Sequence, residues 1–213
     1  MSLVLPRLYA IIDPAQTGGR PAIRVCRELL AAGVRLIQYR DKHSSSLAVF
    51  EACKEFAQEI RKQGGFFFAN DRADIALASG AHGVHVGQED LPVELARRVV
   101  GPESWVGVST HNLVQLREAD ASPADYIAIG PVFETRSKEK PDATVGLEGV
   151  RAARKATAKP LVAIGGITTQ NARSVIEAGA DSVAVIHDLL AAPDPAARSR
   201  EYLQILGEIL RTA

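Results

Sequence analysis

Eight short apolar runs alternate with helical stretches along this chain, and no other feature of the sequence constrains the fold as strongly. The runs lie at 8–13, 36–41, 66–71, 83–87, 105–110, 126–131, 161–166 and 182–187. Most are almost continuously apolar, which is typical of parallel strands covered by helices on one face and by a packed core on the other. Strand–helix units repeated in this way predict an α/β fold.

We expect the strands to close into a single (β/α)8 TIM barrel over residues 1–213, rather than to form an open, doubly wound sheet. A chain of 213 residues is near the lower end of the size range of such barrels and can bury one core. No linker-like or low-complexity segment interrupts the pattern. In these barrels the active site lies at the C-terminal ends of the strands. Functional side chains are therefore expected directly after each apolar run.

Charge and cysteine content narrow the class of protein. The 25 Lys and Arg residues balance the 25 Asp and Glu residues, so the chain has no basic field to attract nucleic acid or an anionic membrane. Cys26 and Cys53 stand in helical stretches without a C-x-x-C spacing, which predicts reduced, structural thiols. The apolar start is interrupted by Pro6 and Arg7 and fits neither a signal peptide nor a membrane span. These features predict a cytoplasmic protein whose partners are small molecules.

The run at 36–41 and the residue after it carry three long polar side chains with period-two spacing. If Ile37 faces the helices, then Gln38, Arg40 and Lys42 point into the barrel mouth. Two cations there would be costly unless an anion or carboxylates offset them. For this motif alone, an anion site and an ordinary solvated strand end remain open alternatives.

Carboxylates follow the next two strands. Asn70 and Asp71 end the run at 66–71, and Asp90 follows the run at 83–87. Each aspartate precedes a helical stretch and would be expected, taken singly, to cap it. Beside Arg40 and Lys42, the pair fits better as oxygen ligands of Mg²⁺ in a metal–diphosphate site.

The fifth run, 105–110, ends at Ser109 and Thr110 and is followed by His111. The sequence around them contains neither a nucleophile elbow nor an acid to orient the histidine, so Ser109 is interpreted as a positioned hydrogen-bond donor.

The longest connection, after 126–131, is rich in hydroxyl and cationic groups: Thr135, Arg136, Ser137 and Lys138. Such a segment can bind phosphate and close over a substrate, or it can be a solvated charged loop.

The last two strands end at Gly165-Gly166 and at Ile186-His187. Glycines let backbone N–H groups approach an anion, and TIM barrels often hold phosphate after strands seven and eight. A tight turn without a ligand is the alternative for the glycines. Together, the strand ends predict an enzyme that joins two phosphorylated substrates, one of which loses diphosphate.

Over almost its whole length the sequence resembles the thiamine phosphate synthase family. The matching motifs are QYRDK at 38–42, NDR at 70–72, HVGQEDLP at 85–92, GVSTHN at 107–112, GPVFETRSK at 130–138, AIGGIT at 163–168 and AVI at 184–186. The resemblance implies a TIM barrel that couples 4-amino-2-methyl-5-(diphosphooxymethyl)pyrimidine to a thiazole phosphate. Diphosphate leaves first, and the thiazole nitrogen captures the pyrimidine methylene cation.

The resemblance also implies roles for individual residues. Those expected to bind the pyrimidine diphosphate are Gln38, Arg40, Lys42, Asn70, Ser109 and Lys138, and among them Arg40, Lys42, Ser109 and Lys138 are expected to act in catalysis. Mg²⁺ is expected on Asp71 and Asp90. The thiazole phosphate is expected at Thr135, Arg136, Ser137, Gly166, Ile186 and His187.

Two positions depart from the family pattern, which more often has Ser at His187 and Pro at Glu134. Two other functions compete with the synthase: a thiazole tautomerase of the same fold, and a phosphate-binding sensor without catalysis. The intact QYRDK and NDR motifs and Asp90 argue against the tautomerase, which would have no use for a diphosphate–metal set. The exterior helix faces do not decide whether the protein is a homo-oligomer.

Overall fold

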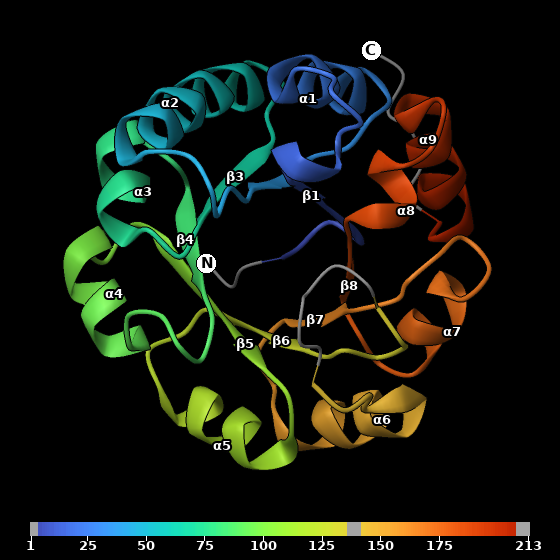
Figure 1. Ribbon diagram of the computed structural model, residues 1–213. Coiled ribbons are helices and arrows are strands. Elements are labelled where there is room, and N and C mark those ends of the chain that lie inside the picture. The colour runs from blue at the N-terminus through green and yellow to red at the C-terminus, as the bar shows by residue number, and fades with distance from the viewer. Residues whose placement is uncertain (1–3, 136–141, 208–213) are drawn as a thin grey trace.

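The computed structural model describes residues 4–135 and 142–207, and these form a closed barrel of eight parallel strands (Figure 1). The strands pair in chain order, and β1 pairs with β8 to close the sheet. The strands are β1 (Leu8–Ile12), β2 (Leu36–Tyr39), β3 (Phe66–Asn70), β4 (Gly83–Val86), β5 (Trp105–Thr110), β6 (Tyr126–Ile129), β7 (Leu161–Ile164) and β8 (Ser182–Val185). The predicted single (β/α)8 TIM barrel is confirmed, with each strand at its expected place.

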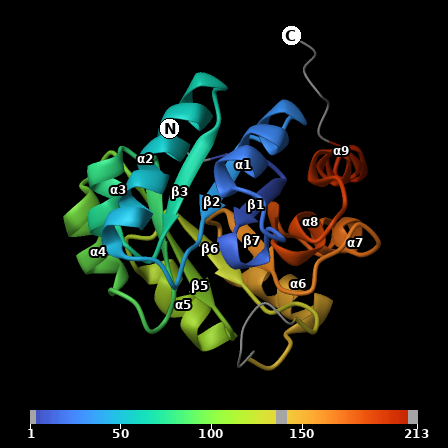
Figure 2. The same cartoon turned by 45° about the horizontal axis from the view of Figure 1, so that its top comes forward.

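Helices follow the strands and form a ring around the barrel, as Figures 1 and 2 show. They are α1 (Ala22–Ala31), α2 (Ser46–Lys62), α3 (Ala73–Ser79), α4 (Val93–Val100), α5 (Leu113–Ala121), α6 (Gly146–Ala156), α7 (Ala172–Glu177), α8 (His187–Leu190) and α9 (Pro195–Ile205), with a 3-10 turn η1 (Pro14–Gln16) after β1. Side-chain hydrogen bonds cap the N-termini of three of these helices: Ser45 caps α2, Asn112 caps α5 and Asp194 caps α9. The sequence pattern did not predict α8, which is one turn long.

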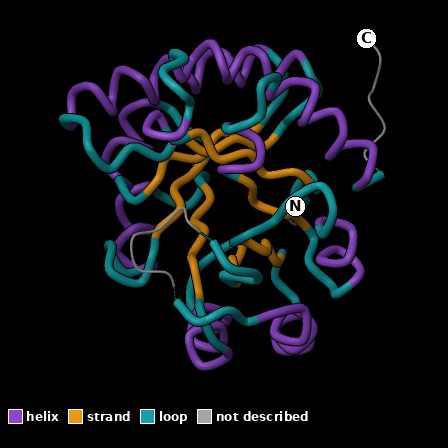
Figure 3. Tube along the Cα trace, turned by 45° about the vertical axis from the view of Figure 1, so that its right-hand side comes forward, coloured by secondary structure: helices purple, strands orange, loops and turns teal. Residues whose placement is uncertain are grey.

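The strands separate two apolar layers, one between the sheet and the helices and one inside the barrel. The tube view shows the helices lying outside the strands (Figure 3). Ile37 and Phe67 face outward into the layer between sheet and helices. Tyr9, Phe68 and Tyr126 face inward and fill the barrel. Because strand side chains alternate between the two faces, each strand supplies both layers. The inward positions near the C-terminal ends are the ones that line the site.

No helix within 4–135 or 142–207 combines the length and hydropathy that crossing a bilayer requires. Cys26 and Cys53 are both free and buried. Burial raises the pKa of each thiol to about 12, so the thiolate, which is the reactive form, is suppressed. Both cysteines therefore serve as small apolar groups in the layer under α1 and α2, as expected for structural thiols.

Candidate active site

The C-terminal end of β2 turns Gln38 into the barrel while Ile37 packs outward, as the alternation predicts. The next inward position, Arg40, forms an ion pair with Asp13, which follows β1. Asp13 is buried and also accepts a hydrogen bond from the backbone N–H of Ala15. A carboxylate thus offsets the first of the two cations. Asp13 fixes one edge of the guanidinium, whose remaining N–H groups are available to an anion.

Lys42 forms an ion pair with Asp71, and Asp71 lies beside Asp90. Asp90 accepts a hydrogen bond of 2.8 Å from the backbone N–H of Gly87. The ends of β2, β3 and β4 therefore bring one ammonium and two carboxylates together, although they are separated by up to 48 positions along the chain.

Neither aspartate caps the helix that follows it. Helices α3 and α4 begin after Arg72 and Pro92, and neither start has a side-chain cap. Asp71 instead has a φ of +60°, the left-handed region that costs a side-chain-bearing residue about 1 kcal/mol or more. Helix capping, the alternative explanation from the sequence, therefore does not account for this pair.

Burial and proximity separate the pKa values of the two carboxyl groups. Burial, together with the hydrogen bond to Asp90, raises the pKa of Asp71 to about 6 in spite of Lys42. Burial also opposes ionisation of Asp90, but the hydrogen bonds from Asp71 and from the N–H of Gly87 outweigh it and lower the pKa of Asp90. Two carboxyl groups this close therefore favour one shared proton below about pH 6.

These two carboxylates fit a magnesium ion by the chemistry of their donors. Mg²⁺ prefers oxygen ligands and in phosphate-transfer sites is held by one or two carboxylates, with water and substrate phosphates completing the shell. Among the described residues no group of three or more His, Cys, Asp or Glu side chains converges on one point. Asp71 and Asp90 are the two carboxylates that could hold such an ion, with water and substrate as its other ligands.

Ser109, the second-last residue of β5, points its side chain toward the barrel, where its hydroxyl lies 2.8 Å from Nε2 of His85 on β4. The side chain of Gln88 donates to the carbonyl of Ser109. Asn70 lies on the neighbouring β3, paired in register with His85. His111 turns away from Ser109, and its Nδ1 lies 2.6 Å from the carbonyl of Gly130. Ser109 and His111 therefore do not form a nucleophile–base pair.

On the β6–β8 side of the mouth, the described residues with an expected role contribute mainly backbone. Gly166 follows β7 with a φ of +64°, and a Cβ there would come within 2.4 Å of the carbonyl oxygen of Glu134. The glycine is therefore required for the loops after β6 and β7 to pack together, whether or not an anion is bound. Thr135 ends the first described part of the β6 loop, half-buried. Ile186 and the exposed His187 stand where β8 gives way to α8.

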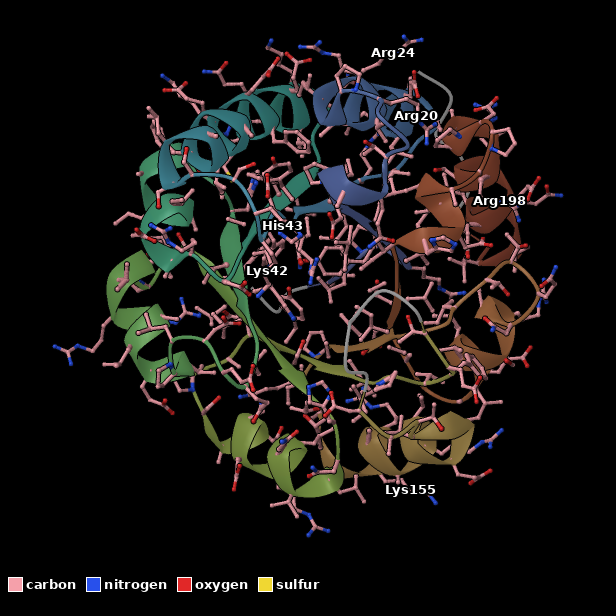
Figure 4. All side chains as sticks on the ribbon, viewed as in Figure 1. Arg20, Arg24, Lys42, His43, Lys155 and Arg198 are labelled. Atoms are coloured by element: carbon pink, nitrogen blue, oxygen red, sulfur yellow. The ribbon has the colours of Figure 1, made fainter. Side chains whose placement is uncertain are left out.

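Three of the expected site residues, Arg136, Ser137 and Lys138, lie outside the described residues. A hollow of about 330 Å³ lies beside Asp71 and Asp90, and another of about 290 Å³ is bordered by Thr135 and Pro131. The first is next to the charged groups after β2–β4, and the second is next to the β6 loop. In Figure 4, Lys42 and His43 lie inside the ring of helices, whereas Arg24 and Lys155 lie at its outer rim.

With this geometry established, comparison with known proteins identifies the family. The family model for thiamine monophosphate synthase matches residues 8–189. A thiamine-phosphate synthase of Koribacter versatilis is 54% identical over 208 residues, which cover 96% of this chain and 97% of that protein. One of Chloroflexus aurantiacus is 43% identical, covering 92% of this chain and 90% of its own. The chain belongs to the thiamine monophosphate synthase family.

A solved structure agrees with this assignment. The thiamine phosphate pyrophosphorylase of Pyrococcus furiosus superposes with a TM-score of 0.87 at 36% identity, and the match covers 96% of each chain. Membership of the thiamine monophosphate synthase family makes this chain a transferase of thiamine biosynthesis.

Three inward-facing residues near the site were not predicted from the sequence. Asp13 was included in the first apolar run, although its place at a strand end marked it as a partner for a cation. Tyr9 and Tyr126 lie within two of the apolar runs and received no role from the sequence, but their hydroxyl groups lie 3.0 Å apart inside the barrel. Period-two alternation places both tyrosines on the inward face, and that was the signal that could have identified them.

Proposed function

We propose that this chain is a thiamine-phosphate synthase that couples 4-amino-2-methyl-5-(diphosphooxymethyl)pyrimidine with 4-methyl-5-(2-phosphoethyl)thiazole, or its carboxylated tautomer. The products are thiamine phosphate and diphosphate. The observation that carries the proposal is the cluster after β1–β4, in which Arg40 and Lys42 are paired with Asp13 and Asp71 beside Asp90. This cluster supplies cations for a diphosphate and carboxylates for a metal.

The reaction proceeds in two steps in this proposal. The bond between the pyrimidine methylene carbon and the diphosphate oxygen breaks first, and its electron pair leaves with diphosphate. The ring nitrogen of the thiazole then uses its lone pair to form the new C–N bond with the methylene cation. No covalent nucleophile on the protein is needed, in keeping with the absence of a Ser109–His111 pair.

The chain's own residues act by stabilising the charge that develops on the leaving group. Arg40 and Lys42 hold positive charge at fixed positions, and a unit charge pair at about 4 Å contributes roughly 4 kcal/mol at an effective dielectric near 20. Lys138 is proposed to add a third cation. Gln38, Asn70 and Ser109 orient the pyrimidine, while Thr135, Arg136, Ser137, Gly166 and the backbone at Ile186-His187 hold the thiazole phosphate.

Asp71 and Asp90 are proposed to hold Mg²⁺, which when bound adds positive charge beside the diphosphate. Their support is the shared-proton arrangement, in which burial and the neighbouring carboxyl group raise the pKa of Asp71. We further propose a cytoplasmic enzyme whose partners are small phosphorylated molecules and neither nucleic acid nor membrane, consistent with a formal net charge of zero. Whether it acts as a homo-oligomer is a matter for a solution measurement of mass.

An endpoint assay tests the function. The protein is incubated with the pyrimidine diphosphate, the thiazole phosphate and Mg²⁺, with and without EDTA, and thiamine phosphate and diphosphate are measured. We expect equal amounts of both products, with formation blocked by EDTA and restored by excess Mg²⁺. Folded protein that binds thiazole phosphate without forming either product would instead favour a tautomerase or a sensor.

A further inference from the structure

Five polar side chains form a continuous hydrogen-bonded chain across the inside of the barrel. Gln38 Nε2 lies 2.9 Å from Tyr9 Oη, and Tyr9 Oη lies 3.0 Å from Tyr126 Oη. Tyr126 Oη lies 2.9 Å from Nδ1 of His85, whose Nε2 lies 2.8 Å from Oγ of Ser109. The chain runs from β2 through β1, β6 and β4 to β5. It joins two of the residues expected to bind the pyrimidine diphosphate, Gln38 and Ser109.

The rings in this chain are held rigidly. Tyr126 stacks on His85 with ring centroids 5.5 Å apart, and Phe68 meets Tyr126 edge-on at 5.3 Å. On the other side, a Cβ on Gly107 would lie 2.0 Å from the Tyr126 ring, so only glycine leaves room for that ring. The tyrosine hydroxyl is therefore fixed opposite His85.

Both tyrosines are phenols throughout the physiological pH range. Each is wholly buried, and burial raises the pKa of Tyr9 and of Tyr126 well above the ordinary value for tyrosine. Each hydroxyl therefore carries one proton and can donate one hydrogen bond.

Counting protons along the chain gives it a single direction. The amide nitrogen of Gln38 can only donate, so the Tyr9 oxygen accepts there. Among the described residues Tyr126 is the other hydrogen-bond partner of the Tyr9 hydroxyl, and the relay assigns the Tyr9 proton to that bond. Tyr126 in turn donates to Nδ1 of His85, and a neutral imidazole in that position carries its proton on Nε2. That N–H donates to Ser109 Oγ, which leaves the hydroxyl proton of Ser109 directed elsewhere.

We propose that Gln38, Tyr9 and Tyr126 form a one-way hydrogen-bond relay that fixes the Nε2–H tautomer of His85 and thereby makes Ser109 a hydrogen-bond donor toward the pyrimidine diphosphate. The identity of that acceptor rests on the proposed function. Tyr9, Tyr126 and His85 are positioning residues, whereas Gln38 and Ser109, at the two ends of the relay, are the members proposed to contact substrate. His85 cannot withdraw the Ser109 proton while it donates to the same oxygen, so the pair is not a nucleophile and its base.

The relay has a signature that does not depend on activity. In the full-length protein labelled with ¹⁵N-histidine, we expect Nδ1 of His85 to show the chemical shift of an unprotonated nitrogen and Nε2 to carry the proton. The signal is assigned among the five histidines by comparison with His85→Gln. In Tyr126→Phe the donor to Nδ1 is lost, and the proton should move toward Nδ1. A wild-type His85 protonated on Nδ1 would overturn the proposal.

Kinetics then distinguish the relay from simple packing. Tyr126→Phe should lower kcat by about 10- to 100-fold, because Ser109 then donates back to His85 instead of to substrate. Tyr9→Phe should lower it by less than about threefold, since Tyr126 keeps its own proton for His85. Both tyrosines are almost fully buried, so a purely structural role would predict similar effects of the two changes.

A double-variant cycle and a matched control complete the test. In a Ser109→Ala background, Tyr126→Phe should cause no further loss of kcat, and KM for the thiazole phosphate should not change in either background. Ser199→Ala removes another buried hydroxyl, on α9, and should leave kcat at the wild-type value. Additive losses with Ser109→Ala, or equal losses in the two tyrosine variants, would contradict the relay. If the wild type lacked synthase activity, the proposed function would fail while the NMR result still tested the relay.

Discussion

The two sides of the barrel mouth use different chemical groups. After β1–β4 the site consists of charged side chains held in ion pairs, namely Arg40 with Asp13 and Lys42 with Asp71. After β6–β8 the described residues instead contribute backbone brought close together, as at Gly166. Function on the first side therefore depends on particular charged side chains. At Gly166 on the second side it depends instead on the lack of a side chain. Single substitutions should therefore damage the two sides in different ways.

The largest expected effect is on the charged side. Asp71→Asn and Asp90→Asn should each lower kcat by a factor of about 100 or more at saturating Mg²⁺, because a carboxylate that holds the cation is lost. Asp74→Asn is the matched control, since Asp74 is an exposed aspartate three positions from Asp71 that pairs with Arg72. Steady-state assays over a Mg²⁺ titration measure the effect. An unchanged Mg²⁺ dependence in both variants would remove these residues from the metal site.

A smaller effect is expected on the backbone side, and it should come from adding one carbon atom. Gly166→Ala places a Cβ 2.4 Å from the Glu134 carbonyl at a φ of +64°, so the loop after β6 must shift. We expect KM for the thiazole phosphate to rise by about tenfold and stability to fall by about 1–3 kcal/mol, measured by urea unfolding.

His187→Ser supplies the contrast on the same side. The exposed His187 side chain is proposed to contribute only backbone, so its replacement should leave both KM values within about twofold of the wild type. A large rise in KM in His187→Ser together with an unchanged KM in Gly166→Ala would show that this side depends on a side chain instead of on backbone.

The smallest effect concerns the opposite end of the barrel, where residues stabilise the fold and do not contact substrate. Nδ1 of His82 accepts a hydrogen bond from the Phe67 backbone N–H at 3.1 Å, and burial together with Arg61 lowers the pKa of His82. The folded state therefore binds the proton less tightly than the unfolded chain. Stability contributed by the neutral ring should be present above about pH 6.5 and lost as the pH falls through the lowered folded pKa.

Urea unfolding between pH 5 and 8 measures this loss, which should amount to about 1 kcal/mol, the net contribution of one hydrogen bond. His82→Gln, which does not titrate, should show a shallower decline at low pH. Identical pH profiles for the two proteins would exclude His82 as the cause.

The barrel was predictable from the sequence because the alternation of an apolar run with a helical stretch is repeated eight times. Each apolar run and each helical stretch supports the same architecture, and an error of one or two residues at a boundary changes nothing. Helix α8 escaped prediction because four residues are too few to show an apolar period.

The site was predictable only in part. Strand ends meet at one rim in any such barrel, so Gln38, Arg40, Lys42, Asp71 and Asp90 could be placed together from their positions alone. Which groups pair with which depends on the register between strands, and the sequence does not display it. The Asp13–Arg40 ion pair and the Tyr9–Tyr126 contact both depend on that register.

Closure of the sheet through β1 and β8 has a consequence for how the protein is made. Leu8 and Tyr9 find their partners Val183 and Ala184 only after most of the chain has emerged from the ribosome. Until then β1 has a free edge that invites pairing with other chains. Contacts of such long sequence separation also slow folding, because the entropy of loop closure precedes their formation. Synthesis of this protein therefore includes a long interval in which half of the binding rim exists and the barrel that supports it does not, and any chaperone assistance would act in that interval.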